Sequence, residues 1–260
     1  MTHFRTCLMT IAALAITTSA GSAAMIEFEG SKFTTNIQST AGTISDVAVG
    51  NDANRLMVVT VSGEGFGSVS NVTWNSQTFT EAITAQGGGG TGATADTASI
   101  WYMLNPAAST TDDVSVTLGD VPTAFSISAS TYYNVAQEAP TTANGSVSSD
   151  GPTPSLDIAA TSGGLIIDVY EANNANFSVA PTAGQTEIFT EDSGSQGWHT
   201  GAAYEIATAD GTQTQTWDGN GQEHAYVAVH FNVVPEPASV ALFGLGGLLM
   251  LKRRDRRTSA

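Results

Sequence analysis

Three histidines are the side chains of residues 25–234 best suited to serve as a base for a nucleophile. They are His199, His224 and His230, and none has the H-x-x-x-H or H-E-x-x-H spacing of a zinc site. No G-x-S-x-G motif is present, and the single cysteine, Cys7, lies near the N-terminus. We therefore predict no catalytic residues and a protein that is not an enzyme.

Acidic side chains far outnumber basic ones. Of 24 Asp and Glu residues, 22 lie within residues 25–234, where Lys32 and Arg55 are the only Lys or Arg, so this segment has a net charge near −20. Paired carboxylates could hydrolyse glycosides, but no E-x-D-x-E strand pattern is present. The negative charge repels nucleic acid and anionic lipid, so we expect no nucleic-acid partner.

One acidic segment contains the ligand types that calcium prefers. Its sequence is Asp-Gly-Asn-Gly-Gln-Glu, which places Asp218, Asn220 and Glu223 in a short loop. Calcium takes carboxylate and carbonyl oxygens from loops. The segment lacks the third ligand and the glycine of a full D-x-[DN]-x-[DN]-G loop. It is predicted either to bind Ca²⁺, the only cofactor considered for this chain, or to form a plain hairpin turn.

Tryptophan rings could stack on sugars. The chain has four of them, at Trp74, Trp101, Trp198 and Trp217. Trp198 is the best candidate for sugar stacking, because it stands beside Gly197 and His199 at the start of a predicted strand. The alternative for each of the four rings is packing in the core.

Strands must position these side chains, because residues 25–234 show no convincing apolar stripe with helical spacing. Short alternating runs separated by Gly, Asn, Asp and Pro turns are typical of an all-β protein. We predict an antiparallel two-sheet β-sandwich, jelly-roll-like, with a signal helix at the N-terminus and a single transmembrane helix at the C-terminus.

Individual segments give more specific expectations. Residues 55–62 are nearly continuously apolar and predict a strand buried on both faces. Residues 75–76, Asn-Ser, predict a two-residue hairpin. Residues 124–135 and 223–233 alternate between apolar and polar, so we expect every second side chain to face solvent, His230 among them.

The two sides of a Ser/Thr/Gly/Pro-rich connector have similar patterns. This predicts a domain of residues 25–233 built from two related halves, 25–138 and 155–233. Residues 55–59, for example, parallel residues 164–168. Convergence of β-sheet composition is the alternative. The first half also resembles a β-sandwich module of bacterial surface and adhesin-like proteins, a resemblance that implies no catalytic residues.

The N-terminus has the features of a secretory signal, residues 1–24. Arg5 gives a positive start, residues 8–16 are apolar, and small residues follow up to Ala24. We predict cleavage after Ala24, with cleavage after Ala23 as the alternative. The expected partners are the Sec translocon and signal peptidase. Because Cys7 lies inside this signal, the mature chain has no disulfide.

The C-terminal segment, residues 234–257, has three parts. It begins with the motif Val234, Pro235, Glu236 and Pro237. The two prolines favour extended backbone. An uncharged run of 14 residues, 238–251, would span roughly 21 Å as a helix, short of a ~30 Å hydrocarbon core. A basic cluster of the kind left on the cytoplasmic side of a membrane closes the segment. It comprises Lys252, Arg253, Arg254, Arg256 and Arg257.

This order of motif, apolar run and basic cluster resembles the PEP-CTERM protein-sorting signal, which is also labelled an ice-binding protein C-terminal motif. The resemblance implies an exosortase as partner, in a Gram-negative bacterium that makes exopolysaccharide. It implies an exported protein that the inner membrane holds transiently before processing, and that is then found at the cell surface or outside the cell. The alternative is an ordinary C-terminal membrane anchor.

Three functions are compatible with these observations. We expect a non-enzymatic surface or extracellular-matrix protein, associated with exopolysaccharide or biofilm. The alternative is a carbohydrate-binding β-sandwich whose aromatic side chains line an exposed face. A secreted hydrolase is the third, and the missing motifs favour it least.

Overall fold

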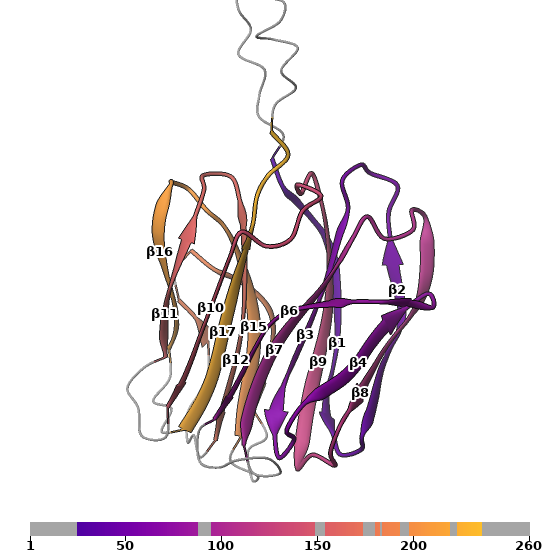
Figure 1. Ribbon diagram of the computed structural model, residues 1–260, viewed down its shortest axis with the longest axis vertical. Helices are drawn as coiled ribbons and strands as arrows, with labels where there is room; N and C mark the ends of the chain where they lie inside the picture. Colours follow the sequence, from indigo (N-terminus) through magenta and orange to yellow (C-terminus); the bar gives the residue numbers. More distant parts are fainter. Residues whose placement is uncertain are drawn as a thin grey trace, which may run out of the picture. The chain divides into compact units, whose positions relative to one another are not determined.

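The computed structural model describes residues 25–87, 95–148, 154–173, 180–182, 184–192, 198–218 and 223–235. They belong to one compact unit, residues 24–235. Every element in these described ranges is a β-strand, and the strands pair antiparallel, which confirms the predicted all-β class (Figure 1). The helices predicted at the two ends fall in residues 1–24 and 236–260, which lie outside the described residues.

The strands form four sheets, so the expected number of two is wrong. Inner sheet 1 contains, in order, β1 (Glu27–Ile37), β9 (Ala124–Tyr133), β3 (Leu56–Glu64), β7 (Asp96–Leu104) and β6 (Thr80–Gly87). Outer sheet 1 contains β2 (Ala41–Val49), β8 (Thr110–Leu118), β4 (Val69–Trp74) and β5 (Gln77–Thr78). Inner sheet 2 contains β10 (Thr142–Ser148), β17 (Glu223–Phe231), β12 (Leu165–Asn173), β15 (Trp198–Ile206) and β14 (Thr186–Asp192). Outer sheet 2 contains β11 (Ser155–Ala160), β16 (Gly211–Asp218) and β13 (Ala180–Pro181).

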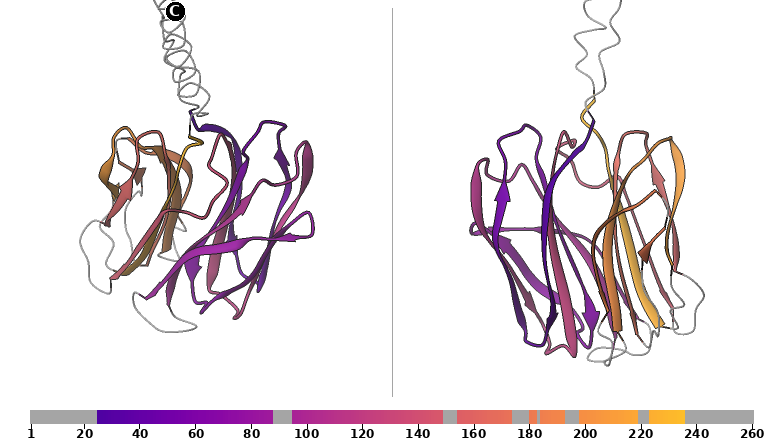
Figure 2. Two further views of the ribbon diagram at one scale, coloured as in Figure 1. Left: turned by 45° about the horizontal axis from the view of Figure 1, so that its top comes forward. Right: turned by 180° about the vertical axis from the view of Figure 1, so that it is seen from behind.

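Three hydrophobic cores hold these sheets as a stack of four layers (Figures 1 and 2). Core 1, with Trp74 and Phe125, fills the space between outer sheet 1 and inner sheet 1. Core 2, with Leu56 and Val227, lies between the two inner sheets, and core 3, with Trp217, lies between inner sheet 2 and outer sheet 2. Burying one Val, Leu or Ile side chain fully stabilises the folded protein by about 1.5–3 kcal/mol, so the three cores supply most of the free energy that holds the sheets together.

The inner sheets are therefore covered on both faces. Residues 55–62 confirm the expectation of a doubly buried strand, since β3 is buried from Leu56 to Gly63. The half-exposed pattern expected for residues 124–135 is wrong, because β9 is buried from Ala124 to Tyr132. Its serines Ser126, Ser128 and Ser130 face the second inner sheet instead of water.

The two halves of the unit share one strand order. Reading the first inner sheet as β1-β9-β3-β7-β6 and the second as β10-β17-β12-β15-β14, each strand takes the same place in its sheet. The outer sheets, β2-β8-β4-β5 and β11-β16-β13, follow the same scheme. Residues 55–59 and 164–168 thus fall on β3 and β12, which occupy the two sheet centres. A bridge between Val135 and Val233 joins the ends of the halves.

Turn chemistry explains the local connections. The predicted hairpin at residues 75–76 is confirmed between β4 and β5. Asn75 and Ser76 have φ values of 47° and 59°, as a two-residue turn between twisted antiparallel strands requires.

The strand register defines two ends of the stack. We call the tail end the one where Leu56 pairs with Tyr132 and Leu165 pairs with Phe231, because the chain leaves there toward Val234. We call the distal end the opposite one, where Glu64 pairs with Asp96.

Candidate functional site

The start of the sorting motif is fixed by Asn134 at the tail end. The Val234 N–H donates to the Asn134 carbonyl at 3.0 Å, and the Asn134 side-chain amide donates to the Met25 carbonyl at 2.9 Å. Asn134 has a φ of 62°, a left-handed conformation that Asn tolerates better than most residues. Asn134 thus contacts both Met25 and Val234, near the two ends of the β unit. Pro235, which follows Val234, is exposed.

The rest of the predicted sorting and export residues lie outside the described part of the chain. These are Ala24, Glu236, Pro237, Lys252, Arg253, Arg254, Arg256 and Arg257. In the described ranges between residues 25 and 235, no helix has the length and apolarity needed to cross a membrane.

The predicted calcium residues belong to two different sheets. Asp218 ends β16 in outer sheet 2 and is exposed, whereas Glu223 begins β17 in inner sheet 2. Asn220 lies outside the described residues. β16 and β17 do not pair with each other, so the alternative of a plain hairpin is wrong. No cluster of three His, Cys, Asp or Glu suited to a metal ion occurs in the described ranges.

The sugar-stacking candidate Trp198 is fully buried at the start of β15, so its ring is closed to a ligand in this structure. The other three tryptophans are buried as well. Among the described residues, the large exposed aromatic rings lie on β1 instead: Phe28 is 40% exposed and Phe33 is 52% exposed. Phe33 stacks on Phe189 with ring centres 5.4 Å apart. Their exposure depends on β1 being a sheet edge, which local sequence does not show.

The three histidines are buried, and His230 does not face solvent as expected. The Thr161 N–H donates to His230 Nε2 at 3.2 Å, and His230 Nδ1 lies 2.7 Å from the Thr141 hydroxyl. Burial lowers the pKa of His224 and of His230, which favours their neutral forms. The prediction failed because it assumed one sheet face open to water, whereas outer sheet 2 covers that face of β17.

Core 3 contains a hydrogen-bonded carboxylate. Asp168 on β12 accepts hydrogen bonds from Trp217 Nε1 at 3.2 Å, from the Tyr226 hydroxyl at 3.2 Å and from Gln185 Nε2 at 2.5 Å. Burial raises its pKa to about 7, although the hydrogen bonds from Tyr226 and Trp217 act in the opposite direction. The equivalent position in β3, Val59, is apolar, so this network has no counterpart at that position of the first half.

The distal end gathers four acidic residues between the inner sheets. Asp96 on β7 and Glu171 on β12 are fully buried, while Glu64 and Glu223 beside them are partly exposed. Burial raises the pKa of Asp96 to about 7 and the pKa of Glu171 well above its usual value. Glu64 and Glu223 raise both pKa values further, because their negative charges oppose ionisation of the pair.

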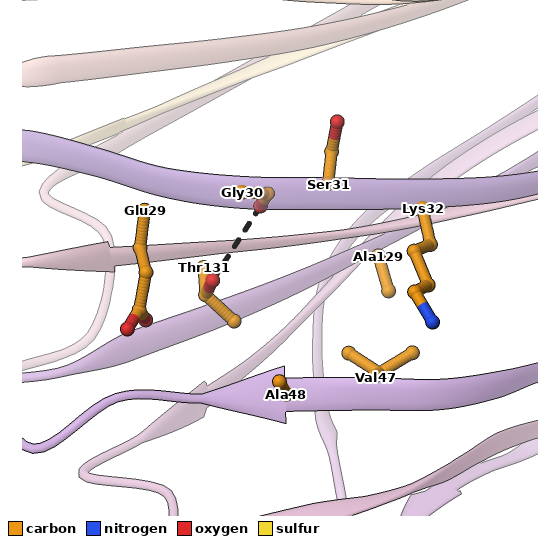
Figure 3. Close-up of a pocket in the computed structure, with 8 residues that line it drawn as sticks. All are labelled: Glu29, Gly30, Ser31, Lys32, Val47, Ala48, Ala129 and Thr131. Carbon is orange, nitrogen blue, oxygen red and sulfur yellow. Dashed lines mark hydrogen bonds between the residues drawn. The ribbon is translucent and has the colours of Figure 1, made fainter. Parts of the chain in front are cut away.

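A groove opens along the edge of the first half, between β1 and β2. It has a volume of about 160 Å³. Figure 3 shows Glu29 and Lys32 extending from β1 toward β2, with Val47 and Ala48 opposite them. Lys32 Nζ donates to the Ser45 carbonyl at 3.1 Å. The groove therefore presents one carboxylate and one ammonium group above an apolar floor, which suits a polar ligand.

The comparisons with known proteins identify the C-terminal segment. Residues 233–257 match the family model described as the PEP-CTERM protein-sorting motif. No curated protein and no solved structure matches the chain. The match begins at Val233, the residue that bridges to Val135 at the edge of the β unit. The chain therefore carries a PEP-CTERM protein-sorting motif, which marks an exported protein that an exosortase sorts to the cell surface.

Proposed function

We propose that this protein is a non-enzymatic component of the cell surface or extracellular matrix, retained in exopolysaccharide after exosortase processing. The sorting motif carries the proposal, because it implies export and delivery. Two features of the β unit support it. The carboxyl groups with strongly raised pKa values, Asp96, Glu171 and Asp168, are buried from substrate. The four stacked layers bury three hydrophobic cores, which stabilise the unit without disulfides.

Processing acts on the segment that follows Val234. A protease binds extended backbone, since a helix or a paired strand hides its own amides. The hydrogen bond from Val234 to Asn134 is the last backbone bond of the β unit before the motif. Pro235 lacks an N–H and cannot extend the pairing. The motif thus follows directly on the β unit and does not extend its sheets, which favours cleavage at or near Glu236.

Mass spectrometry of the mature C-terminus tests this step. We expect the protein from cells with the exosortase to end at or near the motif, and the protein from cells without it to retain Arg257. Glu236→Gln should slow processing, whereas Asp255→Asn in the terminal basic segment serves as the matched control. Surface protein that keeps Leu251 and Arg257 in cells with the enzyme would reduce the segment to a simple membrane anchor.

Glycan binding along β1 is the second candidate function, and the exposed rings favour it. Phe33 offers an open aromatic face supported from behind by Phe189. A second groove, of about 470 Å³, contains Phe33, Lys32 and the hydroxyls of Thr34, Thr43 and Ser45. Aromatic faces beside hydroxyl and charged groups suit sugar rings, which are apolar on their faces and polar at their edges.

A pull-down on the producing strain's polysaccharide tests this second function. Phe33→Ala should lower the bound fraction about five- to tenfold, which corresponds to about 1–1.4 kcal/mol. Val121→Ala is the control, because Val121 is an exposed apolar residue outside the grooves. Equal binding by both variants would remove β1 as the glycan site.

A further inference from the structure

The two halves meet through their inner sheets, and the contact changes character along its length. Near the tail end it is apolar, with Leu56, Leu165 and Phe231 in core 2. Toward the distal end Ser62 on β3 forms a buried hydrogen bond with Thr200 on β15. Thr200 also donates to the Tyr170 carbonyl at 2.8 Å, so the Ser62 hydroxyl is the donor between the halves.

Beyond this bond lie two carboxyl groups with no other partner. Asp96 belongs to the first half and Glu171 to the second, and neither side chain is exposed. They lie close enough that the charge of Asp96 raises the pKa of Glu171. No N–H or O–H of the described residues donates to either carboxyl. Two buried carboxylates in contact cannot both be ionised without a large cost, so at least one of them must hold a proton.

The charged groups around the pair make ionisation harder. Glu64 on β3 and Glu223 on β17 face it from the two sheets, and both are acidic. The neighbour of Glu171 on β15 is the uncharged Thr200. His199 and His224 pair with Ala172, so they lie on the opposite face of inner sheet 2.

No lysine or arginine lies near the pair to compensate its charge. Lys32 and Arg55 are the only such residues between positions 25 and 234. Lys32 donates to the Ser45 carbonyl, and Arg55 donates to the carbonyls of Asp52 and Pro106. A proton is therefore the available means of neutralising the pair.

We propose that Asp96 and Glu171 form a proton-dependent latch, in which a shared proton holds the distal ends of the two halves together and its loss lets them separate there. The apolar contact at the tail end does not titrate, so it keeps the halves joined while the distal end opens. The protein outside the cell thereby responds to the pH of its surroundings at the end farthest from its sorting motif.

The direction of the effect follows from the protons held in each state. In the closed state burial raises the pKa of Asp96 to about 7 and the pKa of Glu171 well above its usual value, and the two carboxyls oppose each other's ionisation. In an open state both carboxyls are hydrated and titrate near pH 4. From pH 5 to pH 8 the closed state thus holds at least one proton more than the open state. The opening equilibrium constant therefore rises at least about tenfold per pH unit.

Hydrogen exchange of the exported protein, measured by mass spectrometry at pH 5, 6, 7 and 8, tests the latch. After correction for intrinsic exchange, the distal segments 96–99 and 169–172 should lose protection as pH rises. The tail-end segments 101–104 and 129–132 should keep theirs. The double variant Asp96→Asn with Glu171→Gln should remove the pH dependence, because its two amides hydrogen-bond without titrating.

Further variants separate the latch from general destabilisation. Asp168→Asn removes a buried carboxyl from core 3 and should leave the distal pH dependence unchanged. Should the double variant fail to fold, Glu171→Gln alone should hold the distal end closed at pH 8, because its amide N–H replaces the shared proton. Protection that does not vary with pH in the native protein overturns the proposal, as does distal protection restored at pH 8 by calcium ions.

Discussion

Replacing Asp168 tests how a buried carboxyl sets the pH dependence of the second half. The side chain is 1% exposed and accepts three hydrogen bonds in core 3. Its pKa in the folded protein, raised to about 7 by burial, lies above the 3.8 of an exposed aspartate. Between these two values the folded state holds a proton that the unfolded state has lost. The stability contributed by this group is therefore fully present below pH 4 and lost as the pH rises through 7.

The shift sets the size of the effect. A rise from 3.8 to about 7 corresponds to about 4 kcal/mol at 1.36 kcal/mol per pKa unit, and about 3 kcal/mol of this is lost between pH 5 and pH 8. The amide in Asp168→Asn does not titrate, so the variant does not lose this stability between pH 5 and pH 8. We expect the variant to be about 1–3 kcal/mol less stable than the native protein at pH 5. The reason is that the new amide NH₂ group at this position faces one of the N–H or O–H donors from which Asp168 accepts, so that hydrogen bond is lost. At pH 8 the native protein has lost this stabilisation, so Asp168→Asn should lie between equal stability and about 2 kcal/mol greater stability than the native protein.

Urea unfolding at pH 5, 6, 7 and 8, followed by tryptophan fluorescence, measures this difference. Contributions from other titrating groups, including Asp96 and Glu171, are common to both proteins and cancel. Asp157→Asn on β11 is the control, because the Asp157 side chain is exposed and, among the described contacts, its carboxylate accepts only from the Thr214 hydroxyl. A free-energy difference between native protein and Asp168→Asn that stays constant from pH 5 to pH 8 would refute the reasoning.

Three further experiments test other parts of the stack. Asn134→Ala should lower the free energy of unfolding by about 1–2 kcal/mol in urea titrations, whereas Asn134→Gly should cost less because glycine adopts a φ of 62° freely. A double-mutant cycle of Ser62→Ala and Thr200→Val should give a coupling energy of about 0.5–1.5 kcal/mol, and additive losses would exclude the bond between the halves. Trp74→Ala should cost about 3–5 kcal/mol, seen as a lower melting temperature, since it empties core 1.

Local pattern predicted the elements of the fold but not how many layers they form. The hairpin at residues 75–76 and the doubly buried β3 depend on nearby residues alone, and both expectations hold. Alternation of apolar and polar residues in β9 and β17 predicted that one face of each strand is exposed to solvent, as is usual for such a pattern. Here the polar positions are mostly Ser, Thr and His, which a second sheet can cover when they find partners. Thr60 and Ser128 show this, with their hydroxyls 2.7 Å apart in the buried interface.

The candidate sites divide in the same way. The sorting motif is contiguous in sequence, so its residue types and order were enough to predict it. The carboxyl pair joins Asp96 to Glu171 across two sheets, and no spacing along the chain relates these positions. The same holds for Phe33, whose exposure depends on β1 being the last strand of its sheet. A sequence signal existed for Asp96, which begins a strand of otherwise apolar or small residues. Glu171 had no such signal, because it lies inside a strand that also contains Asp168.

The pair of Asp96 and Glu171 lies at the end of the β unit opposite to the start of the sorting motif, so the two ends of the interface between the halves respond differently to pH. Asn134 holds both ends of the β unit at the tail end, where the halves share the Val135–Val233 bridge and the apolar part of core 2. Opening at this end would break backbone and apolar contacts together, neither of which depends on pH. Opening at the distal end exposes carboxyl groups that gain hydration when ionised. The same sequence thus makes the end that leads to the sorting motif insensitive to pH and the other end responsive, because the buried carboxyl groups between the halves, Asp96 and Glu171, lie at the distal end of the interface.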